Sequence, residues 1–315
     1  MTQAQPATRH MDAERPMLLR FAAASIAAAI VSIGMKLGAY VITGSVALLS
    51  DGLESLVNLA AAVVALAALW IAALPADEEH AYGHSKAEYL SSGFEGALIL
   101  LAAVVIVWQA GDRLRHPRPL ASPGLGLAAA AIATLVNLVV AVVLLRAGRR
   151  FDSITLEADA HHLVADVITT IGVMIGLAIT ALTSIHWVDP IVAFLVAANI
   201  VRIGFDLLRR SALGLLDTAL PAEMRSEITR ILQEERAHGV DFHAIRTRQA
   251  GARRFVSFHI LVPGDWSVQR GHDLLEGIED RIRRSIPRCT VFTHLEPLED
   301  PASFEDTRLE RSPRE

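Results

Sequence analysis

The chain has 315 residues, of which 52% are hydrophobic and only 20% are charged, and its mean hydropathy is +0.40. This composition excludes an ordinary soluble protein and indicates a membrane protein. The net charge of -5 is too small to predict a nucleic-acid partner, and a single cysteine, Cys289, excludes an internal disulfide framework and a multi-cysteine metal site.

Six apolar runs, each long enough to cross a bilayer, follow a polar N-terminal segment (residues 1–17) that we expect to be flexible. The runs cover residues 18–41, 46–74, 89–114, 125–145, 158–182 and 190–208 and predict a six-helix transmembrane domain over residues 18–216. A turn at residues 43–45 joins the first two runs into a hairpin, and Pro75 ends the second helix. We interpret the first run as a retained helix because its length suits a span better than a signal peptide.

The distribution of basic residues predicts the orientation, because six spans place both termini on the same side. The terminal side carries Arg15, Arg20, Lys86, Arg146, Arg149, Arg150, Arg209 and Arg210, whereas the opposite side carries Arg113, Arg115 and Arg118. This excess predicts that both termini are cytoplasmic.

Hydropathy falls after residues 216–221, where a soluble cytoplasmic domain over residues 217–298 is expected to begin. Residues 221–235 have the pattern of an amphipathic helix, residues 243–249 and 255–262 alternate like strands around Gly251, residues 266–285 form a second helix and residues 291–297 a third strand. The order αββαβ indicates a small α+β domain of the ferredoxin-like type, with its helices on one face of the sheet. Residues 299–315 are expected to form a disordered charged tail.

Carboxylates and an amide interrupt the second apolar run at residues 44–61. Glu54 and Asn58 are four residues apart and share one face of a helix, and Asp51 lies about one turn before Glu54 on nearly the same face. An ionisable group at bilayer depth costs several kcal/mol unless it faces a cavity, a partner or an ion. These residues therefore predict a cation site in the second span.

The fifth apolar run repeats this arrangement. His162 and Asp166 are four residues apart and share a face, whereas His161 is rotated by about a quarter turn. With Glu54 and Asn58 they supply three oxygens and one imidazole nitrogen, a tetrahedral set for a first-row divalent metal. Asp51 and His161 are alternative ligands for the same metal. A rival interpretation, in which these groups only hold the helices together, seldom requires so many ionisable groups at one depth.

Two further groups of residues are candidate metal sites. In the charged loop after Pro75, Asp77 and a His80–His84 pair have suitable spacing, although such loops are often merely solvated. In the soluble domain His294 and Glu296 point to the same face of one predicted strand, and the other candidates, His243, His259 and His272, come from separate elements. The alternative there is a set of ordinary surface histidines.

Together these features resemble the cation diffusion facilitator family, in particular its bacterial iron and zinc efflux branch. The resemblance rests on the polar groups of the second span, on His162 and Asp166 of the fifth, on the loop PADEEHAYGHSKAE, and on the run GLLDTALPAE that leads into the αββαβ domain. It covers residues 18–297. The resemblance implies a homodimeric exporter in the bacterial inner membrane, surrounded by lipid, that moves a divalent metal out of the cytoplasm in exchange for protons. It implies neither an enzymatic activity nor a cofactor; the metal is the cargo.

The resemblance also implies roles for individual residues. The transport site is expected at Glu54, Asn58, His162 and Asp166, the loop site at Asp77, His80 and His84, a dimer-bridging regulatory site at His243, His259, His272, His294 and Glu296, and an interlocking charge pair near the dimer hinge at Lys86 and Asp217.

Two positions of the second span depart from the branch that the chain resembles. The second span of that branch usually offers two aspartates, and here the corresponding residues are Glu54 and Asn58. Asn58 cannot exchange a proton, and the ionised ligands sum to about -2, which a divalent ion neutralises. This coordination admits manganese, iron or cobalt beside zinc.

Two other classes of protein also place metal ligands in membrane helices. An intramembrane metallohydrolase needs an open metal position with a general base, and the sequence has no HExxH motif. A metal-sensing receptor needs a sensor domain but no transport. Movement of metal across the membrane of a sealed vesicle distinguishes an exporter from a metallohydrolase and from a receptor.

Overall fold

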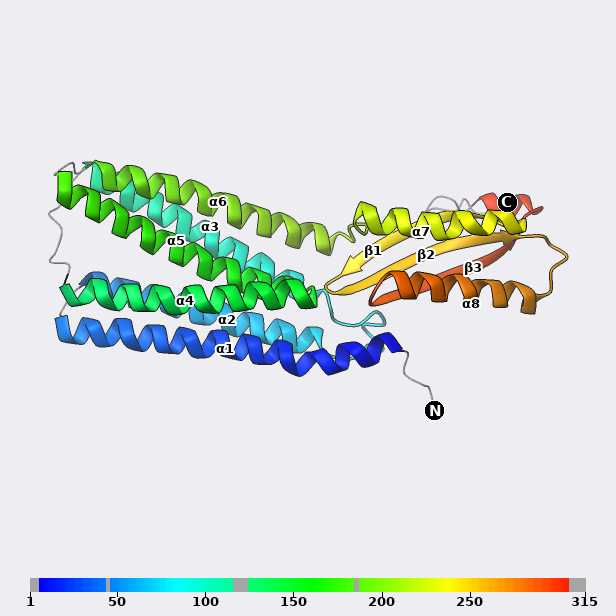
Figure 1. Ribbon diagram of the computed structural model, residues 1–315, viewed down its shortest axis with the longest axis horizontal. Helices are drawn as coiled ribbons and strands as arrows, with labels where there is room; N and C mark the ends of the chain where they lie inside the picture. The colour runs from blue at the N-terminus through cyan, green and yellow to red at the C-terminus, as the bar shows by residue number, and fades with distance from the viewer. Residues whose placement is uncertain (1–5, 44–45, 116–123, 184–186, 306–315) are drawn as a thin grey trace. The chain divides into compact units, whose positions relative to one another are not determined.

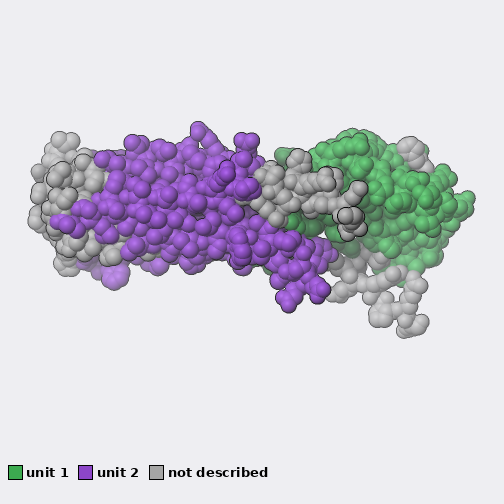
Figure 2. Space-filling model, turned by 90° about the horizontal axis from the view of Figure 1, so that it is seen from below, with its two compact units in different colours: residues 1–11, 214–315 green, residues 12–213 purple. Residues whose placement is uncertain are grey.

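The computed structural model describes residues 6–43, 46–115, 124–183 and 187–305, which divide into two compact units (Figures 1 and 2). The helical unit comprises residues 12–213, and the C-terminal unit comprises residues 214–315 together with residues 1–11.

The helical unit contains long helices arranged as a bundle. Their bounds are α1 (Pro6–Thr43), α2 (Val46–Ala72), α3 (Ala87–Arg115), α4 (Gly124–Phe151), α5 (Ile154–Thr183) and α6 (Val188–Leu215). α5 packs against α2, α3 and α4, so it lies at the centre of the contacts (Figure 1). One apolar cluster joins α1, α2, α4 and α5 around Leu144 and Leu156, and another joins α3, α5 and α6 around Ile99 and Ile200.

By length and composition, four helical segments among the described residues are able to cross a membrane. They are Pro16–Met35, Ala87–Asp112, Ala131–Phe151 and Pro190–Leu215. In α2 the apolar segment found is Asn58–Ala72, which is shorter. α5 is interrupted by Asp159, His161, His162 and Asp166, and these polar groups lower its hydropathy. The structure therefore shows a transmembrane helical domain, and six crossings stay a prediction.

Small residues and a tight turn bring the helices close together. A Cβ atom on Gly96 of α3 would lie 3.1 Å from the backbone nitrogen of Leu208 and 3.2 Å from the carbonyl oxygen of Gly204, so α3 and α6 approach at a position that suits glycine. Between α4 and α5, Asp152 has a φ of 53° and makes the turn. Ser153 follows, and its hydroxyl accepts a hydrogen bond from Leu156 N at 3.5 Å, as an N-cap does.

The C-terminal unit has the element order α7 (Ala222–Glu235), β1 (Asp241–Ala250), β2 (Arg253–Val262), α8 (Val268–Ser285) and β3 (Cys289–Pro297). This is the αββαβ order expected from the sequence. β2 is the central strand, antiparallel to β1 and parallel to β3. The crossover through α8 supplies the connection that a parallel pair requires.

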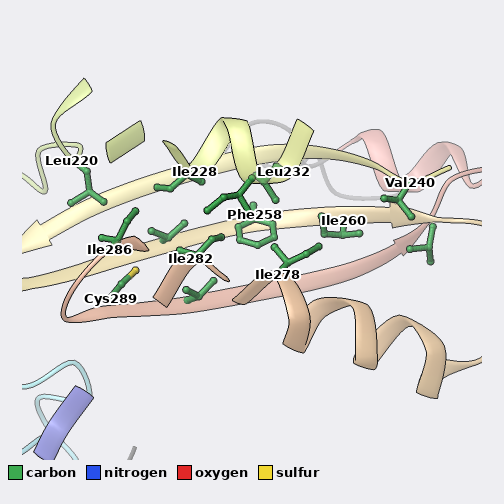
Figure 3. Packing of buried hydrophobic residues seen from close by; sticks show 14 residues of the cluster. Leu220, Ile228, Leu232, Val240, Phe258, Ile260, Ile278, Ile282, Ile286 and Cys289 are labelled. Atoms are coloured by element: carbon green, nitrogen blue, oxygen red, sulfur yellow. The ribbon is translucent and has the colours of Figure 1, made fainter. Parts of the chain in front are cut away.

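The core of this unit lies between one face of the sheet and the two helices. Phe258 is fully buried and lies between Leu232 of α7 and Ile278 of α8 (Figure 3). Alternate residues of β2, such as Val256 and Ile260, point to the same face. The intervening residues, including His259, therefore point to the opposite face of the sheet, where the candidate metal ligands gather.

Part of each terminal segment is helical, and the expected flexibility of both segments stays a prediction. α1 begins at Pro6, so helix covers most of the 1–17 segment for which we expected flexibility. In the segment expected to be a disordered tail, Asp300 accepts a hydrogen bond from Ala302 N at 2.9 Å and Ser303 donates to Pro297 O at 2.8 Å, which together hold the short helix Pro301–Phe304. Residues 306–315 lie outside the described part.

Candidate metal centres

The first centre lies between α2 and α5. The side-chain oxygen of Asn58 lies 2.7 Å from His162 Nε2, and the amide nitrogen of Asn58 donates a hydrogen bond to Asp166 Oδ2. His162 is 5% exposed, so the contacts are made inside the helical unit. The i, i+4 spacing on α5 puts His162 and Asp166 on the face that meets α2. An amide oxygen, an imidazole and a carboxylate thus converge where a divalent metal has three suitable ligands.

The other predicted members of this centre have different positions. The side chains of Asp51 and Glu54 lie outside the described residues, so their part in the site stays a prediction. His161 is half-buried, and its charged neighbours are Glu157, Arg210, Arg149 and Asp206. Its part in the site also stays a prediction.

α5 is anchored at its first turn by a buried carboxylate of α3. Glu88 Oε2 accepts a hydrogen bond from the Ser153 hydroxyl at 2.5 Å and lies 3.5 Å from Thr155 N, and the Thr155 hydroxyl donates to Glu88 O at 3.3 Å. A carboxylate at a helix N-terminus is favourable because unpaired amide groups point toward it. These bonds fix the end of α5 that is two turns from His162.

The loop between α2 and α3 forms the second centre. Asp77 Oδ1 lies 3.1 Å from His80 Nδ1, and Asp77 Oδ2 lies 3.3 Å from His84 Nε2. Gly83 has a φ of 80° and donates to His80 O at 2.8 Å, which turns the chain so that both imidazoles reach the same carboxylate. One ligand atom from each of the three residues lies within 4.8 Å of the others.

The electrostatics of the loop favour the ionised carboxylate. Asp77 accepts the backbone amide of His80 at 2.6 Å, and this hydrogen bond, with smaller contributions from the His80 and His84 rings, holds the pKa of Asp77 below its ordinary value of 3.8. The carboxylate is therefore available as a ligand at any physiological pH.

The third centre lies on the face of the C-terminal sheet opposite α7 and α8. Strand register explains it, because His243 pairs with His259 across β1 and β2, and His259 pairs with His294 across β2 and β3. His243 Nε2 lies 2.9 Å and His259 Nδ1 lies 3.3 Å from Glu296 Oε2. Ala244, with a φ of 52°, marks the bulge that follows His243 in β1.

Two predicted ligands of this centre lie at its edge or away from it. His294 Nε2 lies 3.6 Å from Glu296 Oε1, but His294 is 64% exposed, whereas Glu296 is 8% exposed. His272 is exposed on α8, outside the group formed by His243, His259 and Glu296. A contribution of His272 through a second copy of the chain stays a prediction.

Comparison with known proteins agrees with this arrangement. Residues 22–216 match the family model for the cation efflux transmembrane domain, and residues 220–298 match the model for the cation efflux protein cytoplasmic domain. The chain belongs to the cation diffusion facilitator family. Members of this family are transporters rather than enzymes, and their cargo is a metal cation, so the protein is a cation efflux transporter of the membrane.

Several members of the cation diffusion facilitator family align with nearly the full chain. A protein of Synechocystis named an uncharacterized transporter is 52% identical over 285 residues, which cover 90% of this chain and 92% of the relative. The cation-efflux pump FieF of Shewanella oneidensis is 30% identical over 276 residues (88% and 93%), and that of Yersinia enterocolitica is 31% identical over 293 residues (91% and 95%). These matches support neither the metallohydrolase nor the receptor interpretation.

The family's predicted charge pair joins residues of the two units, Lys86 and Asp217, and stays a prediction. Within the C-terminal unit, Asp217 Oδ1 lies 3.3 Å from Arg248 Nη1. Asp217 also has a positive φ of 56°, where the chain turns after α6.

Sequence reasoning missed two acids inside the helical unit, Glu95 of α3 and Asp159 of α5. Glu95 is fully buried and Asp159 is 3% exposed. The signal was present, because both lie within apolar runs, and an acid at that depth points to a function in the same way as Asp166 does.

Proposed function

We propose that the protein exports a divalent transition metal, of the zinc or iron(II) type, from the cytoplasm in exchange for protons. The observation that carries this proposal is the convergence of Asn58, His162 and Asp166 between α2 and α5 in a domain that matches the cation efflux family. Glu54, one turn before Asn58, is the proposed fourth ligand.

The contacts of Asn58 suggest how cargo and protons compete. Asn58 bridges His162 and Asp166, so the three side chains occupy neighbouring positions. A metal takes the place of these hydrogen bonds and needs neutral imidazole and ionised carboxylates. Protons arriving from the opposite side return His162 and the carboxylates to their protonated forms and release the metal, which gives exchange by alternating access.

The ligand set also bears on which metals are carried. Two carboxylates, one imidazole and one amide oxygen give a bound divalent ion a net charge near zero, and oxygen-rich coordination suits manganese and cobalt as well as zinc and iron(II). We therefore propose a broader range of metals than a site with a third carboxylate would allow.

The remaining architecture is proposed from the sequence and the family. α1 to α6 cross a bacterial inner membrane six times, and both termini lie on its cytoplasmic side. The C-terminal domain, of ferredoxin-like type, pairs with that of a second copy. Its match to the family's cytoplasmic domain supports the homodimer.

Metal at the third centre is proposed to regulate transport. Glu296 and the imidazoles of His243 and His259 lie on the sheet face opposite α7 and α8, beside the exposed His294, so a metal there can be shared with a second protomer. Such control requires the metal to bind one conformation more tightly than the other.

Proteoliposomes with an internal pH dye test the exporter proposal. Zinc, iron(II), manganese and cobalt are offered to the parent, to Asp166→Ala and to Asp206→Asn, a matched acid-removing variant on α6. We expect metal movement with opposite proton flow in the parent and in Asp206→Asn, and loss of both in Asp166→Ala. Parental exchange in Asp166→Ala contradicts the site, and absence of exchange in the parent contradicts the function.

A further inference from the structure

A second group of buried polar side chains lies between α3 and α5, apart from the three centres described above. Glu95 of α3 is 0% exposed, and neither of its carboxylate oxygens has a hydrogen-bond partner among the described residues. Asp159 of α5 is the neighbouring charge, and its Oδ2 atom also lacks a partner within that part of the chain. Three carboxylate oxygens are thus enclosed without a donor.

Two serines lie beside these acids. Ser91 is one helical turn before Glu95 on the same face of α3, is 2% exposed, and has its hydroxyl directly beside the Glu95 carboxylate, yet that hydroxyl makes no hydrogen bond of normal geometry in the described structure. Ser25 of α1 is 3% exposed and adjoins Asp159. The hydroxyl of Ser91 is an independent sign that a ligand completes this site.

Hydrogen bonds that merely hold the helices together do not account for this group. Glu88, also buried on α3, shows what a structural carboxylate looks like here, because it accepts hydrogen bonds from Ser153 and lies at the N-terminus of α5. Within the described residues, neither oxygen of Glu95 nor Asp159 Oδ2 has a partner of that kind, and the two acids are electrostatic neighbours. Two neighbouring acids in a membrane interior are costly when both are ionised, unless a cation lies between them.

The position of this group relates it to the transport site. Asp159 precedes His162 by three residues on α5 and is its electrostatic neighbour. Glu95 and Asp159 both lie near the N-terminal ends of their helices, and His162 and Asp166 lie progressively deeper along α5. That end of α5 adjoins the last turns of α6, since Arg210 pairs with Glu157 at 2.9 Å, and α6 leads into the cytoplasmic domain. The acids therefore lie between the cytoplasmic end of the bundle and the transport site.

We propose that Glu95, Asp159 and Ser91 form a second divalent-cation site, a staging site that metal occupies before it reaches Asn58, His162 and Asp166. The donor set consists of oxygen atoms, so the site favours hard cations such as Mn²⁺ over metals that prefer nitrogen or sulfur. The assignment as a staging site rests on the proposed export function, whereas the binding site itself does not.

Radioactive manganese binding to the full chain in detergent tests the site directly. The background carries Asp166→Ala, His84→Ala and His259→Ala, which remove a ligand from each of the other three centres. We expect about one equivalent of Mn²⁺ to remain bound, and Glu95→Gln or Asp159→Asn to weaken its binding by roughly 100-fold, as loss of a buried charged ligand predicts. Glu157→Gln, two residues from Asp159 but paired with Arg210, is the matched control and retains the equivalent.

The outcomes separate this inference from the proposed function. Absence of the residual equivalent, or equal binding in Glu95→Gln and its background, overturns the staging site even if the parent transports metal. Retained binding with no transport by the parent overturns the export proposal and leaves the site standing. If Glu95→Gln and Asp159→Asn do not fold, Ser91→Ala removes only a hydroxyl and must still weaken Mn²⁺ binding; an unchanged affinity overturns the inference.

Discussion

Replacing Asn58 by aspartate alters a side chain that contacts both His162 and Asp166. The amide nitrogen of Asn58 donates a hydrogen bond to Asp166, and its oxygen lies 2.7 Å from His162 Nε2. An ionised aspartate keeps the contact with His162 but cannot donate to Asp166. In the metal-free protein two carboxylates then face one another at a buried site, and we expect this state to lose stability.

The size of the effect follows from the bond that is lost. A hydrogen bond to a charged group contributes about 1.5–3 kcal/mol. A bound divalent metal removes the repulsion and gains a charged ligand, so the same free energy reappears as tighter binding. Because about 1.4 kcal/mol corresponds to a factor of ten, we expect the dissociation constant to fall by roughly 10- to 100-fold. This gain is present where both acids are ionised and is lost as the pH falls and the pair takes up a proton.

Calorimetry on the full chain in detergent measures both effects. The background carries His84→Ala and His259→Ala, and Zn²⁺ and Mn²⁺ are titrated in two buffers of different ionisation enthalpy, so that proton release is obtained with the affinity. Asn58→Asp is expected to release up to about one more proton per metal than the parent. Asn137→Asp, at an amide of α4 that is 7% exposed, is the matched control.

Two results would refute this reasoning. One is an Asn58→Asp variant with parental affinity and parental proton release, because Asn58 would then lie outside the ligand set. The other is an equal change in Asn137→Asp, since the effect would then reflect any buried acid in the helical unit.

Further predictions concern the other centres and the domain core. The Asp77 loop is expected to keep its amide protection in hydrogen exchange as the pH falls to about the ordinary carboxyl pKa of 3.8, and to lose it as the pH falls further through the depressed pKa; loss near neutral pH contradicts the assignment. Glu296→Gln should abolish metal binding at the sheet but change the free energy of unfolding of the protein without metal by no more than about 1 kcal/mol. Phe258→Ala, in the core on the other face of the sheet, should lower that free energy by about 3–5 kcal/mol, and thermal unfolding measures both. Because burial raises the pKa of Cys289 to about 11, maleimide at pH 7 should label it only after denaturation, which mass spectrometry detects; rapid labelling of the native protein contradicts the burial.

Local patterns in the sequence were sufficient for much of the fold. Apolar runs predicted the helices because a long apolar segment inside a bilayer must satisfy its own backbone hydrogen bonds, as a helix does. The change from helical to alternating periodicity predicted the αββαβ order. The i, i+4 spacing of His162 and Asp166 placed this pair on one face of its helix, because helical geometry is local.

Only the tertiary structure decided which distant residues meet. The sequence offered His272 on equal terms with His243 and His259, whereas strand register brings His243 and His259 to Glu296 and leaves His272 on a helix outside that group. Register depends on pairing across the whole sheet, which no local pattern fixes. In the same way, the meeting of Glu95 with Asp159 depends on how α3 rotates against α5, and that rotation is set by packing along both helices rather than by the residues next to either acid.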